Sequence, residues 1–426
     1  MLALLPPRSV RNASREVLHQ VSLTWRILVG DVREQLRLLP EASVQCVVTS
    51  PPYWGLRDYG TGSWSGGDPR CEHKGRTKPR QDTSGSTKRF GSTRGTQSSK
   101  RVFAMHVRDV CRCGATRIDK QIGLEVSPAG YISALVDVFK EVRRVLSSDG
   151  SLWLNLGDCY ANDGKWGGKT GGLQSYLSAT DQKTVGRVQR VTGLKPKDLV
   201  GIPWTVAFAL RDAGWWLRRD IVWNKTNAMP ESVNDRPSTT HEYVFLFTKS
   251  KKYYYDAEAI AEPASEAMKA QMRRAYEGQG LKDYDGAGVQ NPSDVKRRII
   301  AGKSGNKTRK FRGEHGGVDG SRAHQGFSVP WEGLTRNARS VWTFTTQPYP
   351  GAHFATFPEE LPARCIKAGS RLGDVVLDPF CGSGTTGQVA IQHGRSFIGI
   401  ELNPQYAELA RTRIGGAAPL FAEAVS

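Results

Sequence analysis

The chain has 426 residues, of which 38% are hydrophobic and 11 are Trp, so it can bury a large core and is not a disordered protein. Its formal net charge of +19 favours a polyanionic partner, because Lys and Arg that neutralise phosphates release counterions. Seven unevenly spaced Cys, no signal peptide and no run of about 18 apolar residues exclude a secreted disulfide scaffold and a membrane protein. We therefore expect a cytoplasmic location. A charge that serves only solubility is the weaker alternative, because the basic excess is spread along the chain.

The N-terminal half of the chain alternates apolar segments with segments rich in Gly and Ser. Three segments rich in Val, Ile and Leu are predicted to be buried strands: residues 23–30, 42–49 and 151–156. The third is expected to be entered through Asp149 and Gly150, as a turn after an amphipathic helix over residues 131–146. Two segments dominated by Gly, Ser, Thr and basic residues are predicted to be flexible: residues 60–101 and 161–195.

The C-terminal half has a regular α/β alternation around one irregular segment. The pattern predicts helices at residues 203–213, 358–368, 385–393 and 404–413, and strands at 215–223, 242–247, 374–377 and 396–401. Residues 256–339 have weak periodicity and many basic side chains. Helices that alternate with short apolar strands predict an α/β fold with a mostly parallel central sheet and helices on both faces.

A glycine-rich motif follows the strand predicted at residues 374–377. It reads Asp-Pro-Phe-Cys-Gly-Ser-Gly-Thr-Thr from Asp378 to Thr386, and a helix begins at its end. Glycines at such a turn let the backbone approach a ligand closely. Glu401 ends the next strand, at the spacing from Asp378 at which a carboxylate can accept hydrogen bonds from ribose hydroxyls. An ordinary tight turn is the alternative, and the full string together with Glu401 disfavours it.

This motif, followed by Gly-Ile-Glu-Leu-Asn-Pro-Gln-Tyr, resembles the S-adenosyl-L-methionine site of DNA amino-methyltransferases. The resemblance implies that residues 378–386 wrap the methionine part of the cofactor, that Glu401 holds its ribose, and that residues 353–358 complete the methionine pocket. The turn at Gly30 and Asp31 is a candidate contact to the adenine. The cofactor-binding residues expected on this basis are Asp31, Phe354, Asp378, Phe380, Cys381, Gly382, Ser383, Gly384, Thr385, Thr386, Glu401 and Asn403.

A second motif, Ser50-Pro51-Pro52-Tyr53, ends the strand predicted at residues 42–49. Two prolines in a row fix φ and hold their carbonyls rigidly, although a plain rigid turn would use them equally well. An exocyclic amine of a base is a poor nucleophile, and hydrogen bonds accepted by Ser50 Oγ and the Pro51 carbonyl would favour a pyramidal, attacking nitrogen. Tyr53 would stack on the flipped base. In the resemblance this tetrapeptide is the catalytic motif.

The catalytic motif precedes the cofactor motif, and this circularly permuted order resembles the beta class of these enzymes. The resemblance implies a Rossmann-like methyltransferase fold. It divides the chain into a catalytic part of the core (1–59), an insertion (60–120), further core (121–255), a basic target-recognition region (256–339), the cofactor-binding part of the core (340–414) and a tail (415–426).

Two pairs of soft metal ligands flank the first flexible segment. Cys71 and His73 form one pair and Cys111 and Cys113 the other, which predicts a four-ligand structural zinc site. The spacing of one residue within each pair is tighter than usual, so unrelated thiols are the alternative.

The expected substrate is double-stranded DNA. In the family that the chain resembles, Ser at the first position of the motif goes mostly with cytosine N4, so the resemblance implies this amine at Ser50, with adenine N6 as the sibling alternative. Residues 227–232 and 235–237 resemble a family loop near the target base, and basic residues of 273–339 are expected to contact phosphate. An RNA or protein methyltransferase and a non-catalytic nucleic-acid-binding protein are the competing hypotheses. A homodimer and a cognate restriction endonuclease are candidate partners.

Overall fold

The computed structural model describes residues 23–55, 59–73, 110–161, 192–228, 230–270, 335–347 and 357–417, and the backbone of 422–424. Several expectations fall outside these residues. They are Phe354, most of the predicted flexible segment 161–195, most of the insertion and most of the target-recognition region.

One large sheet contains nine of the described strands, in the order β10-β6-β7-β5-β2-β11-β12-β1-β13. The strands are β1 (Leu23–Val29), β2 (Val44–Thr49), β5 (Leu146–Leu156), β6 (Trp216–Lys225), β7 (His241–Thr248), β10 (Val341–Phe344), β11 (Val375–Asp378), β12 (Ser396–Glu401) and β13 (Ala422–Ala424). Every neighbouring pair is parallel except the two pairs that β7 makes with β5 and β6. The mostly parallel sheet predicted from the sequence is confirmed.

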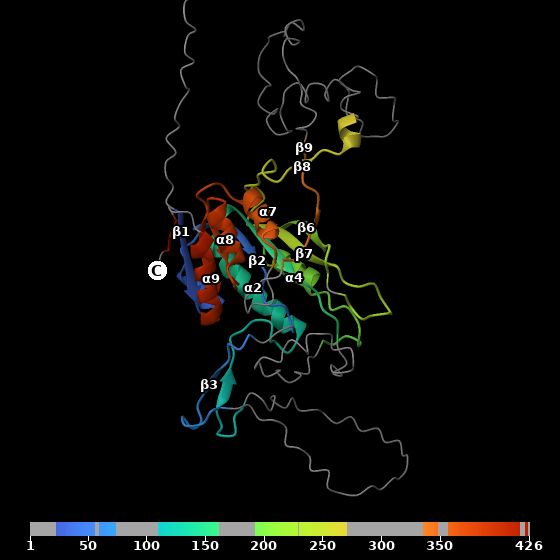
Figure 1. The fold of residues 1–426 in the computed structure, drawn as a ribbon. Coiled ribbons are helices and arrows are strands. Elements are labelled where there is room, and N and C mark those ends of the chain that lie inside the picture. The colour runs from blue at the N-terminus through green and yellow to red at the C-terminus, as the bar shows by residue number, and fades with distance from the viewer. Residues whose placement is uncertain are drawn as a thin grey trace, which may run out of the picture.

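Helices cover both faces of this sheet (Figure 1). On one face lie α1 (Val32–Leu38), α2 (Pro128–Val145) and α4 (Ile202–Asp212), and on the other lie α7 (Glu360–Gly369), α8 (Thr385–Gln392) and α9 (Pro404–Ala417). Strand residues alternate between the two cores: Val47 packs with the first set of helices, while Cys46 and Val48 pack with the second. The strands are apolar on both faces because both faces are covered.

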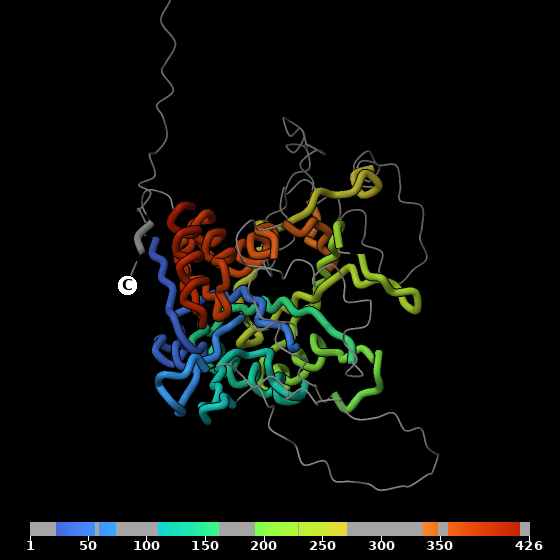
Figure 2. The backbone as a smooth tube through the Cα atoms, turned by 60° about the horizontal axis from the view of Figure 1, so that its bottom comes forward, coloured from blue at the N-terminus to red at the C-terminus, as the bar shows by residue number. Residues whose placement is uncertain are grey.

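The first and last described strands are neighbours in the sheet. Strand β1 pairs with β12 on one side and with β13 on the other, and Figure 2 shows the blue N-terminal strand beside the red C-terminal helices. The boundary predicted at residue 415 falls inside α9, and β13 adds an edge strand that the sequence analysis did not predict. Strand β10 was not predicted either. Both strands lie at an edge of the sheet and are short. They are recognised by their hydrogen-bonded pairing and not by a hydrophobic pattern in their own sequence.

The turn expected at Asp149 and Gly150 is wrong, because these residues lie inside β5, which begins at Leu146. The register between β2 and β5 shifts between Val44 and Cys46, so an irregularity in the ladder replaces the turn. A Cβ at Gly150 would lie 2.6 Å from the Leu146 side chain, so the glycine serves close packing at this irregularity.

Two small antiparallel sheets lie outside the large one (Figure 1). One pairs β3 (Ser63–Ser65) with β4 (Thr116–Ile118), and the other pairs β8 (Glu262–Pro263) with β9 (Thr335–Arg336). The first pair shows that the segment predicted to be flexible from residue 60 onwards begins with an ordered strand. Within the described residues, we find no helix with the length and apolar character needed to cross a membrane.

Candidate active site

The two motifs predicted to carry the chemistry meet at one edge of the sheet. Strands β2 and β11 are parallel neighbours, with Leu377 opposite Val47, so the loops that follow them leave the sheet side by side. Thr49 Oγ1 donates a hydrogen bond of 2.6 Å to Asp378 Oδ1, across a sequence separation of 329 residues. The catalytic motif and the glycine-rich motif therefore lie at a common site, which is the edge where ligands of open α/β sheets bind.

Asp378 holds the two loops together from inside the protein. Its side chain is buried, with 2% of its surface exposed. Besides the bond from Thr49, it accepts hydrogen bonds from the Phe380 backbone N–H at 3.0 Å and from Thr386 Oγ1 at 2.7 Å. Burial raises the pKa of Asp378 to about 6. The carboxylate therefore shapes the loop through its hydrogen bonds and does not face solvent.

The backbone of the glycine-rich loop is hydrogen-bonded within the loop and to strand β12. The Cys381 N–H donates to the Ile400 carbonyl at 2.9 Å, and the Gly384 N–H donates to the Cys381 carbonyl at the same distance. Gly384 has a φ of +81°, and a Cβ on it would lie 3.0 Å from the backbone of Ala410 in α9. Glycine is needed here both for the left-handed backbone and for the close approach of the helix. The remaining predicted loop residues, Gly382, Ser383 and Thr385, lie in the same turn into α8.

Glu401 lies at the end of β12 beside this loop. Its Oε2 accepts a hydrogen bond of 2.8 Å from the Gly382 N–H, and its Oε1 accepts one of 2.8 Å from the Asn403 N–H. Burial raises the pKa of Glu401. Each carboxylate oxygen can accept a further hydrogen bond, and the side chain is only partly buried. Asn403 also donates through Nδ2 to the Tyr59 carbonyl at 3.3 Å, which connects this corner to the chain beyond the catalytic motif.

Asp31 caps helix α1 directly after β1. It accepts backbone hydrogen bonds from Arg33 and Glu34, and the Arg33 guanidinium donates to both of its carboxylate oxygens, at 3.1 and 2.8 Å. Burial alone would raise the pKa of Asp31, but these donors outweigh it and the pKa is lowered. The Gly30 N–H donates to the Glu401 carbonyl at 2.9 Å, so Asp31 lies at the same sheet edge as the loop.

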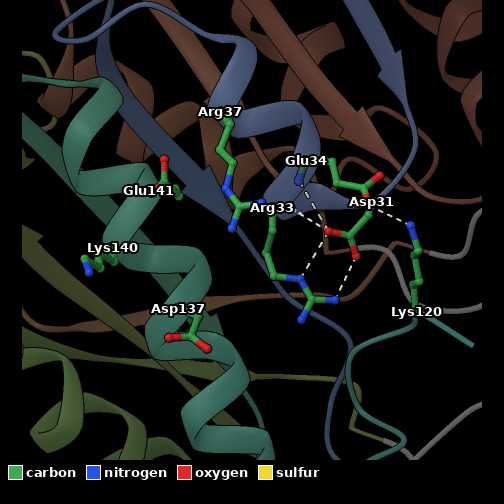
Figure 3. Close-up of a pocket in the computed structure, with 8 residues that line it drawn as sticks. All are labelled: Asp31, Arg33, Glu34, Arg37, Lys120, Asp137, Lys140 and Glu141. Atoms are coloured by element: carbon green, nitrogen blue, oxygen red, sulfur yellow. Dashed lines mark hydrogen bonds and ion pairs between the residues drawn. The ribbon is translucent and has the colours of Figure 1, made fainter.

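A charged hollow of about 540 Å³ opens beside Asp31, between α1 and α2 (Figure 3). Its lining residues are Asp31, Arg33, Glu34, Arg37, Lys120, Asp137, Lys140 and Glu141. Figure 3 shows Arg33 turned back onto Asp31. None of the residues of the glycine-rich loop lines this hollow, so it is distinct from the cradle that residues 378–386 and Glu401 form.

The catalytic motif is joined to β6 and β7 by a chain of hydrogen bonds. Ser50 Oγ donates to Tyr53 Oη at 3.4 Å, and Tyr53 Oη donates to Glu242 Oε2 at 2.7 Å. Burial, and then the Glu242 carboxylate, raise the pKa of Tyr53 well above its usual range, so the phenol keeps its proton. Glu242 is also paired with Lys225 and accepts a bond of 3.1 Å from Asn155 Nδ2. The hydroxyl hydrogen of Ser50 is thereby directed toward Tyr53. The lone pairs of Ser50 Oγ remain available to accept hydrogen bonds.

Other remote residues support the backbone of this motif. Tyr131 Oη in α2 donates to the Pro52 carbonyl at 2.9 Å, and Trp54 Nε1 donates to the Glu125 carbonyl at 2.9 Å. Pro51 is buried. A Cβ on Gly157 would lie 2.6 Å from the Tyr53 ring, so the ring packs directly on that backbone.

The sequence analysis missed four of these supporting residues: Tyr131, Asn155, Lys225 and Glu242. One signal was present, since Glu242 is a charged residue near the start of an apolar strand.

The four predicted metal ligands gather in one place. The ligand atoms of Cys71, His73, Cys111 and Cys113 all lie within 4.8 Å of one another. They flank the small sheet formed by β3 and β4, away from the glycine-rich loop. The other cysteines, Cys46, Cys159, Cys365 and Cys381, are buried or partly buried elsewhere, and all seven are free thiols.

The loop expected near the target base is partly ordered by ion pairs. Arg236 binds Glu231 at 2.6 Å and lies 4.0 Å above the centre of the Tyr160 ring. Lys197 binds Asp235 at 2.6 Å. Residues 271–334, which carry most of the basic side chains expected to contact phosphate, lie outside the described structure.

Comparison with known proteins agrees with this arrangement. A family model described as DNA methylase matches residues 44–412. The type II methyltransferase M.XycI of Xanthomonas campestris pv. cyanopsidis is 39% identical over 91% of this chain and 86% of its own length. M.Cfr9I of Citrobacter freundii is 38% identical with the same coverage, and M.SmaI of Serratia marcescens is 37% identical over 95% of each chain. The chain therefore belongs to the N6/N4 DNA methylase family, DNA methyltransferases that use S-adenosyl-L-methionine.

Proposed function

We propose that this chain methylates the N4 amine of cytosine in duplex DNA, with the target base flipped out of the helix. The observation that carries the proposal is the chain of hydrogen bonds from Ser50 through Tyr53 to Glu242, at the edge where the glycine-rich loop also lies. Ser at the first position of the motif favours cytosine, and adenine N6 is the alternative that the same geometry could serve.

The described residues fit the expected cofactor. Glu401 is fixed by two backbone N–H groups, and its carboxylate oxygens have acceptor capacity left for ribose hydroxyls. Asp31, at the same edge, would face the adenine once its pairing with Arg33 is loosened. When bound, S-adenosyl-L-methionine supplies an electrophilic methyl group on a positively charged sulfur. The task of the protein residues is to bind the target base and to orient its amine.

Orientation of the amine falls to the catalytic motif. Ser50 Oγ, whose own hydrogen is directed to Tyr53, would accept one amine hydrogen, and the Pro51 carbonyl would accept the other. These bonds localise the nitrogen lone pair and hold it in line for attack. The Tyr53 ring has its support on one side at Gly157 and would stack on the base with its other side.

Duplex DNA suits the charge of the chain. A net charge of +19 favours phosphate binding, and the loop that contains Arg236 follows β6 near the catalytic motif. Because the three relatives are named type II methyltransferases, we also propose a role in restriction and modification beside an endonuclease that recognises the same site.

Transfer of a labelled methyl group from S-adenosyl-L-methionine to a panel of duplex DNA, RNA and protein tests the substrate class. We expect label in DNA alone, recovered as N4-methylcytosine after digestion to nucleosides. Recovery as N6-methyladenine would replace the cytosine assignment by its sibling. Label only in RNA or protein, or no cofactor binding by calorimetry, would contradict the proposal.

A further inference from the structure

Four soft ligands outside the active site have the arrangement of a closed metal site. Cys71 Sγ lies 3.6 Å from Cys111 Sγ, and Cys113 Sγ lies 3.3 Å from His73 Nδ1. In a tetrahedral zinc site with metal–ligand bonds of about 2.0 to 2.3 Å, the ligand atoms are about 3.3 to 3.8 Å apart. We propose that these four residues bind one structural Zn²⁺ ion.

Both ligand pairs lie on tight turns that hold them in place without the metal. In the first turn the Cys71 N–H donates to the Asp68 carbonyl at 3.0 Å. In the second the Cys111 N–H donates to the Ala115 carbonyl at 2.7 Å, and the Gly114 N–H donates back to the Cys111 carbonyl at 3.0 Å. These backbone hydrogen bonds fix the two turns from which the ligand side chains extend.

The packing around the sulfurs also fits a metal site. Gly67 has a φ of +77°, and a Cβ there would lie 2.7 Å from Cys113 Sγ, so only glycine lets the two turns approach this closely. The backbone N–H of Cys113 donates to Cys111 Sγ, and that of Ala115 donates to Cys113 Sγ. Such N–H groups stabilise sulfur ligands that carry negative charge.

The donor set favours zinc over a disulfide. The sulfurs of Cys71 and Cys111 are 3.6 Å apart, well beyond an S–S bond of about 2.05 Å. A disulfide would also leave Cys113 and His73 without a function. Three sulfurs and one imidazole are typical of closed, structural zinc sites, in which no position is left for a substrate.

The site would support the catalytic motif from a distance. It joins two segments that are 40 residues apart in sequence, and the second segment continues through β4 into residues 119–125. These residues hold the chain that follows the motif: Gln121 Oε1 accepts from the Tyr59 N–H at 2.8 Å, and the Gly123 carbonyl accepts from the Gly55 N–H at 2.8 Å. Loss of the metal should therefore loosen the small sheet of β3 and β4 first and the catalytic motif second.

Metal analysis of the full-length chain tests this proposal without an activity measurement, so its failure is distinguishable from failure of the proposed function. We expect one zinc per chain after purification without chelator. Replacement by Co²⁺ should give the visible bands of a tetrahedral site and the charge-transfer band of bound sulfur. Cys113→Ser should lose the stoichiometric metal, whereas Cys159→Ser, a thiol outside the cluster, should keep it.

His73→Cys is a control for misfolding, because it replaces one zinc ligand by another and should therefore keep the metal. This variant should retain one zinc per chain and increase the sulfur-to-cobalt band. A wild-type chain that takes up no zinc in titration against a chelating dye would overturn the proposal. So would a Cys113→Ser variant that keeps one equivalent, or a Cys71–Cys111 disulfide in the purified protein.

Discussion

The two loops of the active site are held in different ways. Within the loop after β11, Asp378 binds the Phe380 N–H and Thr386, and Gly384 makes the turn into α8. The end of the next strand adds Glu401, which accepts from the Gly382 N–H. The motif after β2 is held from elsewhere in the chain, by Tyr131 in α2 and Glu242 in β7. The candidate cofactor loop therefore depends mostly on residues near it in sequence, whereas the candidate catalytic motif depends on several elements at once.

Ser50→Ala tests the catalytic side of this comparison and should have the largest effect. Loss of a preorganised hydrogen-bonding group at a reacting atom costs about 100-fold or more in rate. We expect methyl transfer to fall by that amount in single-turnover assays while the cofactor affinity measured by calorimetry stays unchanged. Ser43→Ala, at the other end of β2, where the hydroxyl binds only the Pro40 carbonyl, is the matched control. Normal turnover by Ser50→Ala would remove Ser50 from the mechanism.

Gly384→Ala tests the locally held loop. A side chain at a φ of +81°, with its Cβ 3.0 Å from Ala410, should lower the free energy of unfolding by about 2 to 3 kcal/mol. Cofactor affinity should fall with it, because the turn itself is displaced. Gly416→Ala, inside α9 with nothing near its Cβ, should leave stability unchanged or raise it by up to about 1 kcal/mol. Equal stability of the two variants in denaturant titrations would mean that a side chain at residue 384 does not strain the turn into α8.

Asp378, which joins the two loops, should make stability depend on pH. Burial raises its pKa from 3.8 to about 6, so the folded protein binds this proton more tightly than the unfolded chain does. The stability that this proton contributes is fully present below about pH 4 and is lost as the pH rises through 6. Relative to Asp378→Asn, wild-type stability should fall by on the order of 2 kcal/mol between pH 4 and pH 7. A difference between the two proteins that is constant over this range would contradict the buried carboxyl.

Glu242→Gln tests the remote support of the catalytic motif and should have the smallest effect of these changes. A neutral amide binds the Tyr53 hydroxyl less strongly than a carboxylate, and it can also donate, so Ser50 would be less well oriented. We expect kcat to fall about fivefold, or about 1 kcal/mol, with an unchanged KM for the cofactor. Glu408→Gln, on the exposed side of α9, is the control. An equal loss in kcat and in cofactor binding would indicate a general structural role instead.

The features that could be predicted from the sequence are those whose defining residues lie close together along the chain. The glycine-rich loop was predicted as a turn between a strand and a helix because Asp378, Gly382 and Gly384 define that turn within a few residues. The clustering of the four candidate metal ligands was predictable for the same reason, since each pair lies within a few residues.

The remote contacts could not be predicted in this way. Nothing in the sequence near the catalytic motif indicates that Tyr131 and Glu242 reach it, because strand order and helix packing bring them there. The edge strands β10 and β13 were missed because four and three residues are too few to show a period. Asp149 and Gly150 have turn composition, and they lie within β5 at its register shift, between Leu146 and Ser151, which pair with β2.

The most direct test of the account is the place of the cofactor relative to the catalytic motif. A crystal structure with bound S-adenosyl-L-homocysteine or a cofactor analogue would give the distance from Ser50 Oγ to the sulfur position. The account predicts that the ribose binds Glu401, that residues 378–386 enclose the amino-acid part, and that Ser50 lies within a few ångströms of where the methyl group would be. A cofactor bound in the charged hollow between α1 and α2, with Ser50 remote from its sulfur, would contradict it.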